Sequence, residues 1–88
     1  MSSSPDWKPC IAPGMRLQLE PAQNAWVLLY PEGMVRLNAS ASEVLRRCDG
    51  ARSLAAITAE LEARFRVEGI ASHVRQLVDE GARRGWLV

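Results

Sequence analysis

The spacing of the apolar residues constrains this fold more than any other feature, because it changes near Leu37 from every second residue to every third or fourth. Apolar and polar residues alternate over positions 15–20, which indicates a strand with one buried face. From position 41 onward the apolar residues recur at the 3.6-residue period of amphipathic helices. A chain with strands first and helices afterwards is expected to form an α+β domain.

Three strands are expected before position 38. The alternating segment is the first, and residues 25–30 are apolar on both faces, which is typical of a central strand. Pro31 and Gly33 favour a tight reversal into a short third strand over residues 34–37. These strands form an antiparallel meander, and in sequential order the third lies at the sheet edge with unpaired backbone groups.

Three helices are expected after the strands. Ser40 and Glu43 match a capping box at the start of the first helix, Ser53 is placed to cap the second, and the third spans residues 70–84. A sheet face packed on this three-helix bundle gives a winged-helix-like layout. The residues expected to face inward are Ala41, Val44, Leu45 and Cys48, then Leu54, Ile57, Leu61 and Phe65, then Ile70, Val74, Leu77, Val78 and Gly81.

The first thirteen residues differ in composition from the rest of the chain. Their prolines and serines resist regular structure, so residues 1–13 are predicted to be a flexible arm and residues 14–88 the folded domain. Trp7 is expected to dock back on the core. Neither a signal peptide nor an apolar segment long enough to span a bilayer is visible, which predicts a cytoplasmic protein without membrane association.

The titratable residues do not suggest catalysis. His73 is the single histidine and lies beside an apolar helical stripe, while Cys48 faces the predicted core, where burial would raise its thiol pKa. Asp79 and Glu80 are about 100° apart on a helix, so they cannot form a facing carboxylate pair. No metal-ligand spacing or phosphate-binding glycine motif occurs. The chain is predicted not to be an enzyme, with no metal and no cofactor.

A small winged-helix-like DNA-binding regulator is the alternative, because the third helix carries several arginines. Eleven basic residues nearly balance ten acidic ones, however, and the formal charge is +1. Acidic side chains beside that helix would face phosphates unfavourably. No nucleic-acid partner is therefore expected. The basic and polar residues concerned are Arg75, Gln76, Arg83 and Arg84, and the acidic ones are Glu68, Asp79 and Glu80.

One stretch of sequence carries a family resemblance. Residues 28–38 read LLYPEGMVRLN, and they are followed by Ser40-Ala41, Glu43-Val44-Leu45, Cys48-Asp49-Gly50, Arg52-Ser53-Leu54 and finally Gly85-Trp86-Leu87. This pattern resembles pyrroloquinoline quinone (PQQ) biosynthesis protein D, a family of peptide chaperones in the class of precursor-peptide recognition domains. The resemblance runs from about Met15 to the C-terminus.

The resemblance implies that the chain binds the ribosomal precursor peptide of PQQ. It would present that peptide to a radical S-adenosylmethionine enzyme, which cross-links a glutamate and a tyrosine of the peptide. In this family the peptide adds as a strand beside the third strand, in a groove walled by the third helix. The implied peptide-binding residues are Val35, Arg36, Leu37 and Asn38 on the strand, and Val74, Leu77, Val78 and Gly81 on the helix.

Two points remain open beside this resemblance. Val74, Leu77 and Val78 are equally suited to filling the core, and His73 stands where relatives are expected to carry an acidic residue. A monomer is expected. The short connection at residues 31–33 could act as a hinge, so strand-exchanged dimers are expected at high concentration.

Overall fold

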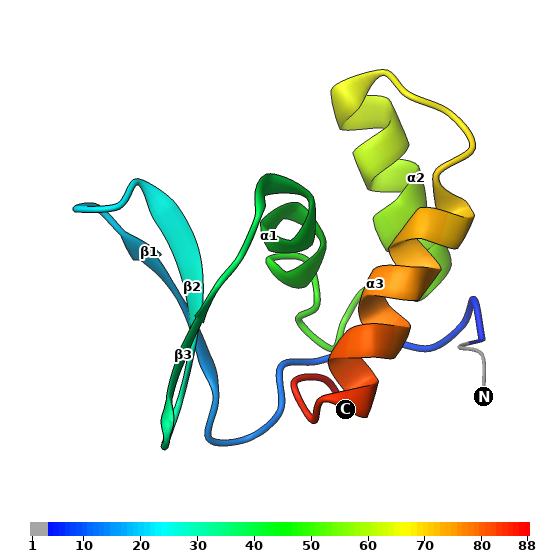
Figure 1. Ribbon diagram of the computed structural model, residues 1–88. Helices are drawn as coiled ribbons and strands as arrows, with labels where there is room; N and C mark the ends of the chain where they lie inside the picture. The colour runs from blue at the N-terminus through cyan, green and yellow to red at the C-terminus, as the bar shows by residue number, and fades with distance from the viewer. Residues whose placement is uncertain (1–3) are drawn as a thin grey trace.

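The computed structural model describes residues 4–88, and its elements follow the predicted order (Figure 1). A three-stranded sheet is followed by three helices, which confirms the α+β fold. The elements are β1 Arg16–Glu20, β2 Ala25–Tyr30, β3 Gly33–Arg36, α1 Ala39–Leu45, α2 Leu54–Phe65 and α3 Ala71–Arg83. Within residues 4–88 no helix is long and apolar enough to cross a membrane.

The sheet is an antiparallel meander in the order β1-β2-β3, as predicted. Leu28 of β2 pairs with Leu17 of β1 and Val35 of β3, so these three apolar side chains share one face. Leu28 is fully buried, and Leu17 and Val35 pack against the main core cluster. The alternation of apolar and polar residues therefore identifies the sheet face that packs against the helices.

The helices contact the sheet through α1. No Cα atom of α2 or α3 lies within 8 Å of a Cα atom in a strand, whereas α1 approaches β2. Arg46 at the end of α1 also lies over the Trp26 ring, 4.7 Å from its centroid. In Figure 1, α1 accordingly lies between the sheet and the pair formed by α2 and α3.

The predicted start of the first helix is wrong by two residues. Asn38, not Ser40, is the N-cap of α1, and its Oδ1 accepts a hydrogen bond of 2.8 Å from the Ala41 N–H. Asparagine caps helices as well as serine does. Leu37 still donates its N–H to the Trp26 carbonyl at 2.9 Å, so the chain passes from sheet to helix within one residue. The third strand correspondingly ends at Arg36 rather than Leu37.

The other helices agree better with the sequence. Ser53 Oγ accepts from the Ala56 N–H at 3.1 Å and caps α2 as predicted, and α3 matches its predicted range to within one residue. Phe65 was predicted to be buried, and this is wrong, since it is 47% exposed. It is the last residue of α2, and the next residue, Arg66, has a left-handed φ of 53° that turns the chain away.

The segment before β1 makes backbone contacts with the C-terminal end. Cys10 donates its N–H to the Val88 carbonyl at 3.1 Å, and Ala12 donates to the Trp86 carbonyl at 2.8 Å. Trp7 packs against the core cluster, as expected. The first three residues of the predicted arm lie outside the described residues, and flexibility of the arm stays a prediction.

Candidate functional site

The outer edge of β3 is one of the two open edges of the sheet. The Leu37 N–H points toward β2, where it bonds to the Trp26 carbonyl. Because backbone groups alternate in direction along a strand, Val35 also faces β2, and Met34 and Arg36 direct their N–H and C=O groups away from it. Within residues 4–88 no strand pairs with this side. The edge can therefore accept hydrogen bonds from another strand and donate to it.

The side chains of β3 divide between the two faces of the sheet. Val35 is half-buried on the helix-facing side, whereas Arg36 and Met34 lie on the opposite face and are exposed, Met34 by 50%. A strand added at this edge would thus place alternate side chains beside an apolar face and beside an exposed face.

A hollow of about 530 Å³ lies where β3 ends and α1 begins. Leu37 and Asn38, both predicted as site residues on the strand, belong to this junction instead. Leu37 is buried in the core and Asn38 caps α1. The hollow is lined by Asn24, Ala25, Trp26, Arg36, Leu37, Asn38, Ala39 and Ser42.

The helical half of the predicted site is mostly core. Val74 and Val78 are almost completely buried, and Gly81 is buried too. A Cβ atom at Gly81 would lie 3.0 Å from Leu87 Cδ1, so this glycine allows the C-terminal segment to pack closely on α3. Leu77 is partly buried and packs against the core cluster, and of these four it presents the most accessible side chain.

The two halves of the predicted site share the core, but their backbones are separated. Leu37 lies in the same buried cluster as Val74 and Val78, and Val35 packs against that cluster. No Cα atom of β3 lies within 8 Å of one in α3, and α1 lies between the sheet and α3 (Figure 1). The backbones of β3 and α3 are therefore not direct neighbours in the free protein.

A second hollow, which the sequence analysis missed, lies between the helices. It measures about 300 Å³ and is mostly apolar, and Phe65 and Val67 beside it are 47% and 42% exposed. His73 contributes to its lining. All three helices line it, together with Val67 and Ile70 from the segment between α2 and α3, and the periodicity of a single helix does not show where three helices leave a hollow. Its lining residues are Ala39, Ser40, Glu43, Val44, Leu61, Phe65, Val67, Ile70, His73 and Val74.

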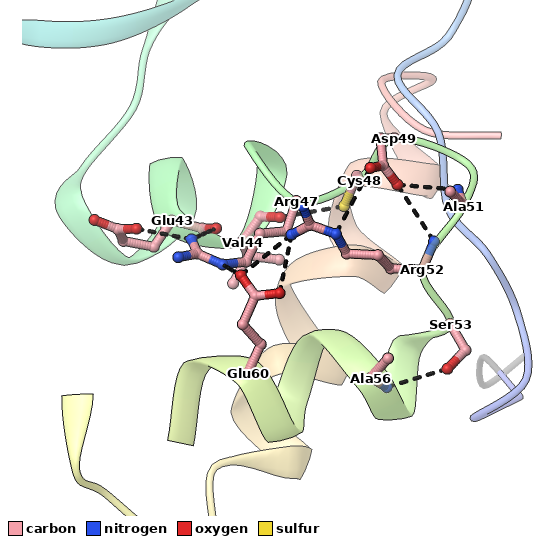
Figure 2. Close-up of polar contacts among 10 residues, drawn as sticks. All are labelled: Glu43, Val44, Arg47, Cys48, Asp49, Ala51, Arg52, Ser53, Ala56 and Glu60. Carbon is pink, nitrogen blue, oxygen red and sulfur yellow. Dashed lines mark hydrogen bonds and ion pairs between the residues drawn. The ribbon is translucent and has the colours of Figure 1, made fainter. Parts of the chain in front are cut away.

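Ion pairs hold α1 and its following turn against α2 (Figure 2). The Arg47 guanidinium bonds to Glu60 Oε2 at 2.5 Å and to Glu43 Oε1 at 2.8 Å. Burial by itself would lower the pKa of Arg47, but the bonded carboxylates outweigh it and raise that pKa. Arg52 also reaches Glu60, at 3.1 Å. Because these charges satisfy one another, the network supports the fold and offers no free charge to a ligand.

The thiol of Cys48 is unsuited to nucleophilic attack. Burial, assisted by the nearby negative charge of Asp49, raises the pKa of Cys48 to about 12. Its Sγ atom lies 3.3 Å from the Val44 carbonyl, within the core. Across residues 4–88, no three His, Cys, Asp or Glu side chains gather as metal ligands.

The comparisons with known proteins agree with this arrangement of strands and helices. The model of the family "Coenzyme PQQ synthesis protein D (PqqD)" matches residues 25–87. The chain belongs to the PqqD family. The family predicted from the sequence is thus confirmed, and the matched region runs from β2 through the C-terminal Leu87 and leaves β1 outside.

Curated relatives named as PqqA binding proteins match almost the whole chain. A PqqA binding protein of Azotobacter vinelandii is 49% identical over 80 residues, covering 90% of this chain and 87% of the relative. A PqqA binding protein of Methylococcus capsulatus is 39% identical over 87 residues, covering 99% of this chain and 94% of the relative.

Two solved PqqD structures share the fold. The solution NMR structure of the PqqD truncation of Methylobacterium extorquens PqqCD is described as a functional, stand-alone recognition element for ribosomally synthesized and post-translationally modified peptides. It aligns with a TM-score of 0.76 at 26% identity, covering 91% of this chain and 87% of that one. The crystal structure of PqqD from Xanthomonas campestris aligns with a TM-score of 0.56 at 36% identity, covering 94% of each chain.

Proposed function

We propose that this chain binds the PqqA precursor peptide of PQQ biosynthesis as a strand added to β3. It then presents the peptide to the radical S-adenosylmethionine enzyme that cross-links it. The observation that carries the proposal is the open edge of β3, where no strand of the described residues 4–88 pairs with the backbone groups of Met34 and Arg36. Relatives up to 49% identical are PqqA binding proteins, which supports this ligand.

Strand addition suits a chaperone because its affinity comes mainly from the backbone. Each peptide residue that pairs with Met34 or Arg36 exchanges hydrogen bonds with it, whatever its side chain. Alternate side chains then select the sequence, and those on the inner face lie beside Val35. Leu37 and Asn38 hold the end of the edge in place through the core and the α1 cap.

The helical residues contribute to the groove in a different way. We propose that Leu77 contacts the peptide directly, because its side chain is the most accessible of the four. Val74, Val78 and Gly81 would support the helix α3 that forms the groove wall without contacting the peptide, since they are buried in the free protein.

In this proposal the chain itself catalyses no reaction. Its buried thiol has a raised pKa, and the cross-linking chemistry would belong to the partner enzyme and that enzyme's cofactor. The DNA-binding alternative is less favoured, because the relatives are named as PqqA binding proteins. We place the protein in the cytoplasm, where the precursor peptide is made, as a monomer that exchanges strands only at high concentration.

Calorimetric titration with a synthetic PqqA precursor peptide tests the proposal, together with amide chemical-shift mapping. Binding at one-to-one stoichiometry is expected, with shifts at residues 34–38. Met34→Pro removes an outward N–H from an edge strand, a position that tolerates proline, and should abolish binding.

Leu19→Pro is the matched control. By the same alternation of backbone groups, Leu19 directs its N–H to the open edge of β1, on the other side of the sheet. This variant should bind like the unchanged protein. Equal loss of affinity in both variants, or full affinity in Met34→Pro, would refute strand addition at β3.

The role of the partner enzyme has its own test. The protein, the peptide and the radical enzyme, mixed and passed through a size-exclusion column, should elute as a ternary complex. The Met34→Pro variant should not carry the peptide into that complex. Delivery of the peptide by Met34→Pro as efficient as by the unchanged protein would show that presentation does not depend on β3.

A further inference from the structure

Arg36 is an exposed cation at the open edge of β3. Within residues 4–88 no carboxylate, acceptor or aromatic ring engages its guanidinium, and its side chain is exposed. Other arginines are engaged in pairs: Arg47 and Arg52 share Glu60, and Arg83 and Arg84 share Glu80.

The surroundings of Arg36 complement an anion. Its side chain lines the hollow of about 530 Å³ at the end of β3, and no other lining residue carries a charge. A carboxylate entering there would meet one unpaired cation and no competing acidic group. Such opposite-charge pairs form readily between residues directly opposite on neighbouring strands, whose Cβ atoms lie about 4.5–5.5 Å apart.

Arg36 is also one of the two β3 residues whose backbone faces outward. A peptide residue that bonds to this backbone would lie directly opposite and on the same face as the guanidinium. Met34, two residues earlier, is the other outward-facing residue, and its exposed apolar side chain lies on that same face. The edge therefore presents a charge and an apolar group at a fixed spacing of two residues.

We infer that Arg36 forms an ion pair with an acidic residue of the bound peptide. An apolar residue two positions later in the peptide then lies opposite Met34. The order follows from antiparallel addition, because the partner strand runs from Arg36 toward Met34. This inference rests on the proposed function and adds the register and the side-chain specificity of the peptide. Arg36 is then a specificity-determining residue.

Charge reversal on both partners tests the inference. Arg36→Glu should raise the dissociation constant of the precursor peptide about tenfold, because attraction is replaced by repulsion, and Arg36→Gln should raise it about threefold. Each Asp and Glu of the peptide is then changed to Lys in turn. One such peptide should bind Arg36→Glu to within about threefold of the original affinity, while the others should not.

Arg16→Glu is the matched control, because Arg16 lies on β1, the opposite edge strand, and its side chain lies on the same sheet face as that of Arg36. It should leave peptide affinity within about twofold. Thermal melts of both variants should match the unchanged protein, since both positions are exposed.

The outcomes separate the two proposals. Binding by the unchanged protein without rescue by any reversed peptide would overturn the role of Arg36 and leave strand addition standing. A loss in Arg16→Glu as large as in Arg36→Glu would also overturn it. No binding of the peptide to the unchanged protein would overturn the proposed function, and this inference with it.

Discussion

Replacing Arg47 with alanine should cost this small domain about 2 kcal/mol of its free energy of unfolding. The Arg47 side chain is 11% exposed and joins Glu43 to Glu60 of α2, as Figure 2 shows. Removing it loses two charge-assisted hydrogen bonds between side chains, the one to the Glu43 carbonyl, and the packing of the aliphatic stem.

The size of this loss in stability depends on the solvent exposure of the Glu43 and Glu60 carboxylates and on the ion pairs that they retain in the variant. Glu43 and Glu60 are 29% and 43% exposed, so solvent screening reduces each lost ion pair to about 1 kcal/mol or less. After the change Glu43 still has Arg46 at 3.5 Å, and Glu60 still has Arg52 at 3.1 Å. Neither charge is left unpaired, so the cost stays below the roughly 3–5 kcal/mol of a broken buried pair.

Urea denaturation followed by circular dichroism measures this free energy. A fall in melting temperature of about 10 °C should accompany it for a domain of this size. Arg47→Met, which keeps the stem without the charge, should recover about half of the loss. Arg83→Ala removes an exposed pair with Glu80 and should change stability by about 0.5 kcal/mol or less. An Arg47→Ala variant as stable as Arg83→Ala would refute the reasoning.

Two further predictions concern the α1 cap and the buried thiol. Asn38→Ala should lower stability by about 1 kcal/mol, measured by thermal melts, because Ala41 loses its capping acceptor; Asn38→Ser, which restores an oxygen, should stay near the original value. Alkylation of Cys48 at pH 8 should be far slower in the folded protein than in denaturant, because its pKa is raised to about 12. A thiol pKa above its unfolded value of 9.0 contributes stability that is present below pH 9 and is lost as the pH rises toward 12. Unfolding midpoints should therefore fall more steeply over that range than in Cys48→Ala, and rapid labelling of the native thiol would contradict the assignment of Cys48 to the core.

The strands and helices were largely predictable because their signals are local. Alternation over β1 and the Pro31 to Gly33 turn indicated a meander, and Ser53 marked the start of α2. The start of α1 was misplaced because two acceptable caps, Asn38 and Ser40, lie two residues apart. The sheet hydrogen bond at Leu37, which decides between them, joins residues distant in the sequence.

Some features of the candidate site were likewise predictable from the sequence, and others were not. An open edge at β3 was predictable, since the short third strand follows a central one, and the family resemblance indicated the same edge. The sequence did not show that β3 and α3 lie apart, or that Phe65 stays exposed beside an apolar hollow. Helical periodicity placed Leu77 on the same stripe as Val74 and Val78, but could not tell which of the three is accessible.

The sequence by itself therefore determined the order and type of the elements, the apolar face of each, and membership in a peptide-binding family. These depend on side-chain periodicity, turn residues and short motifs, which act over a few positions. The tertiary structure alone decided that Arg36 has no partner among residues 4–88 and that α1 lies between the sheet and α3. Such features depend on how segments distant in the sequence pack together. That packing determines which polar groups form hydrogen bonds or ion pairs within the protein and which stay available to bind a ligand.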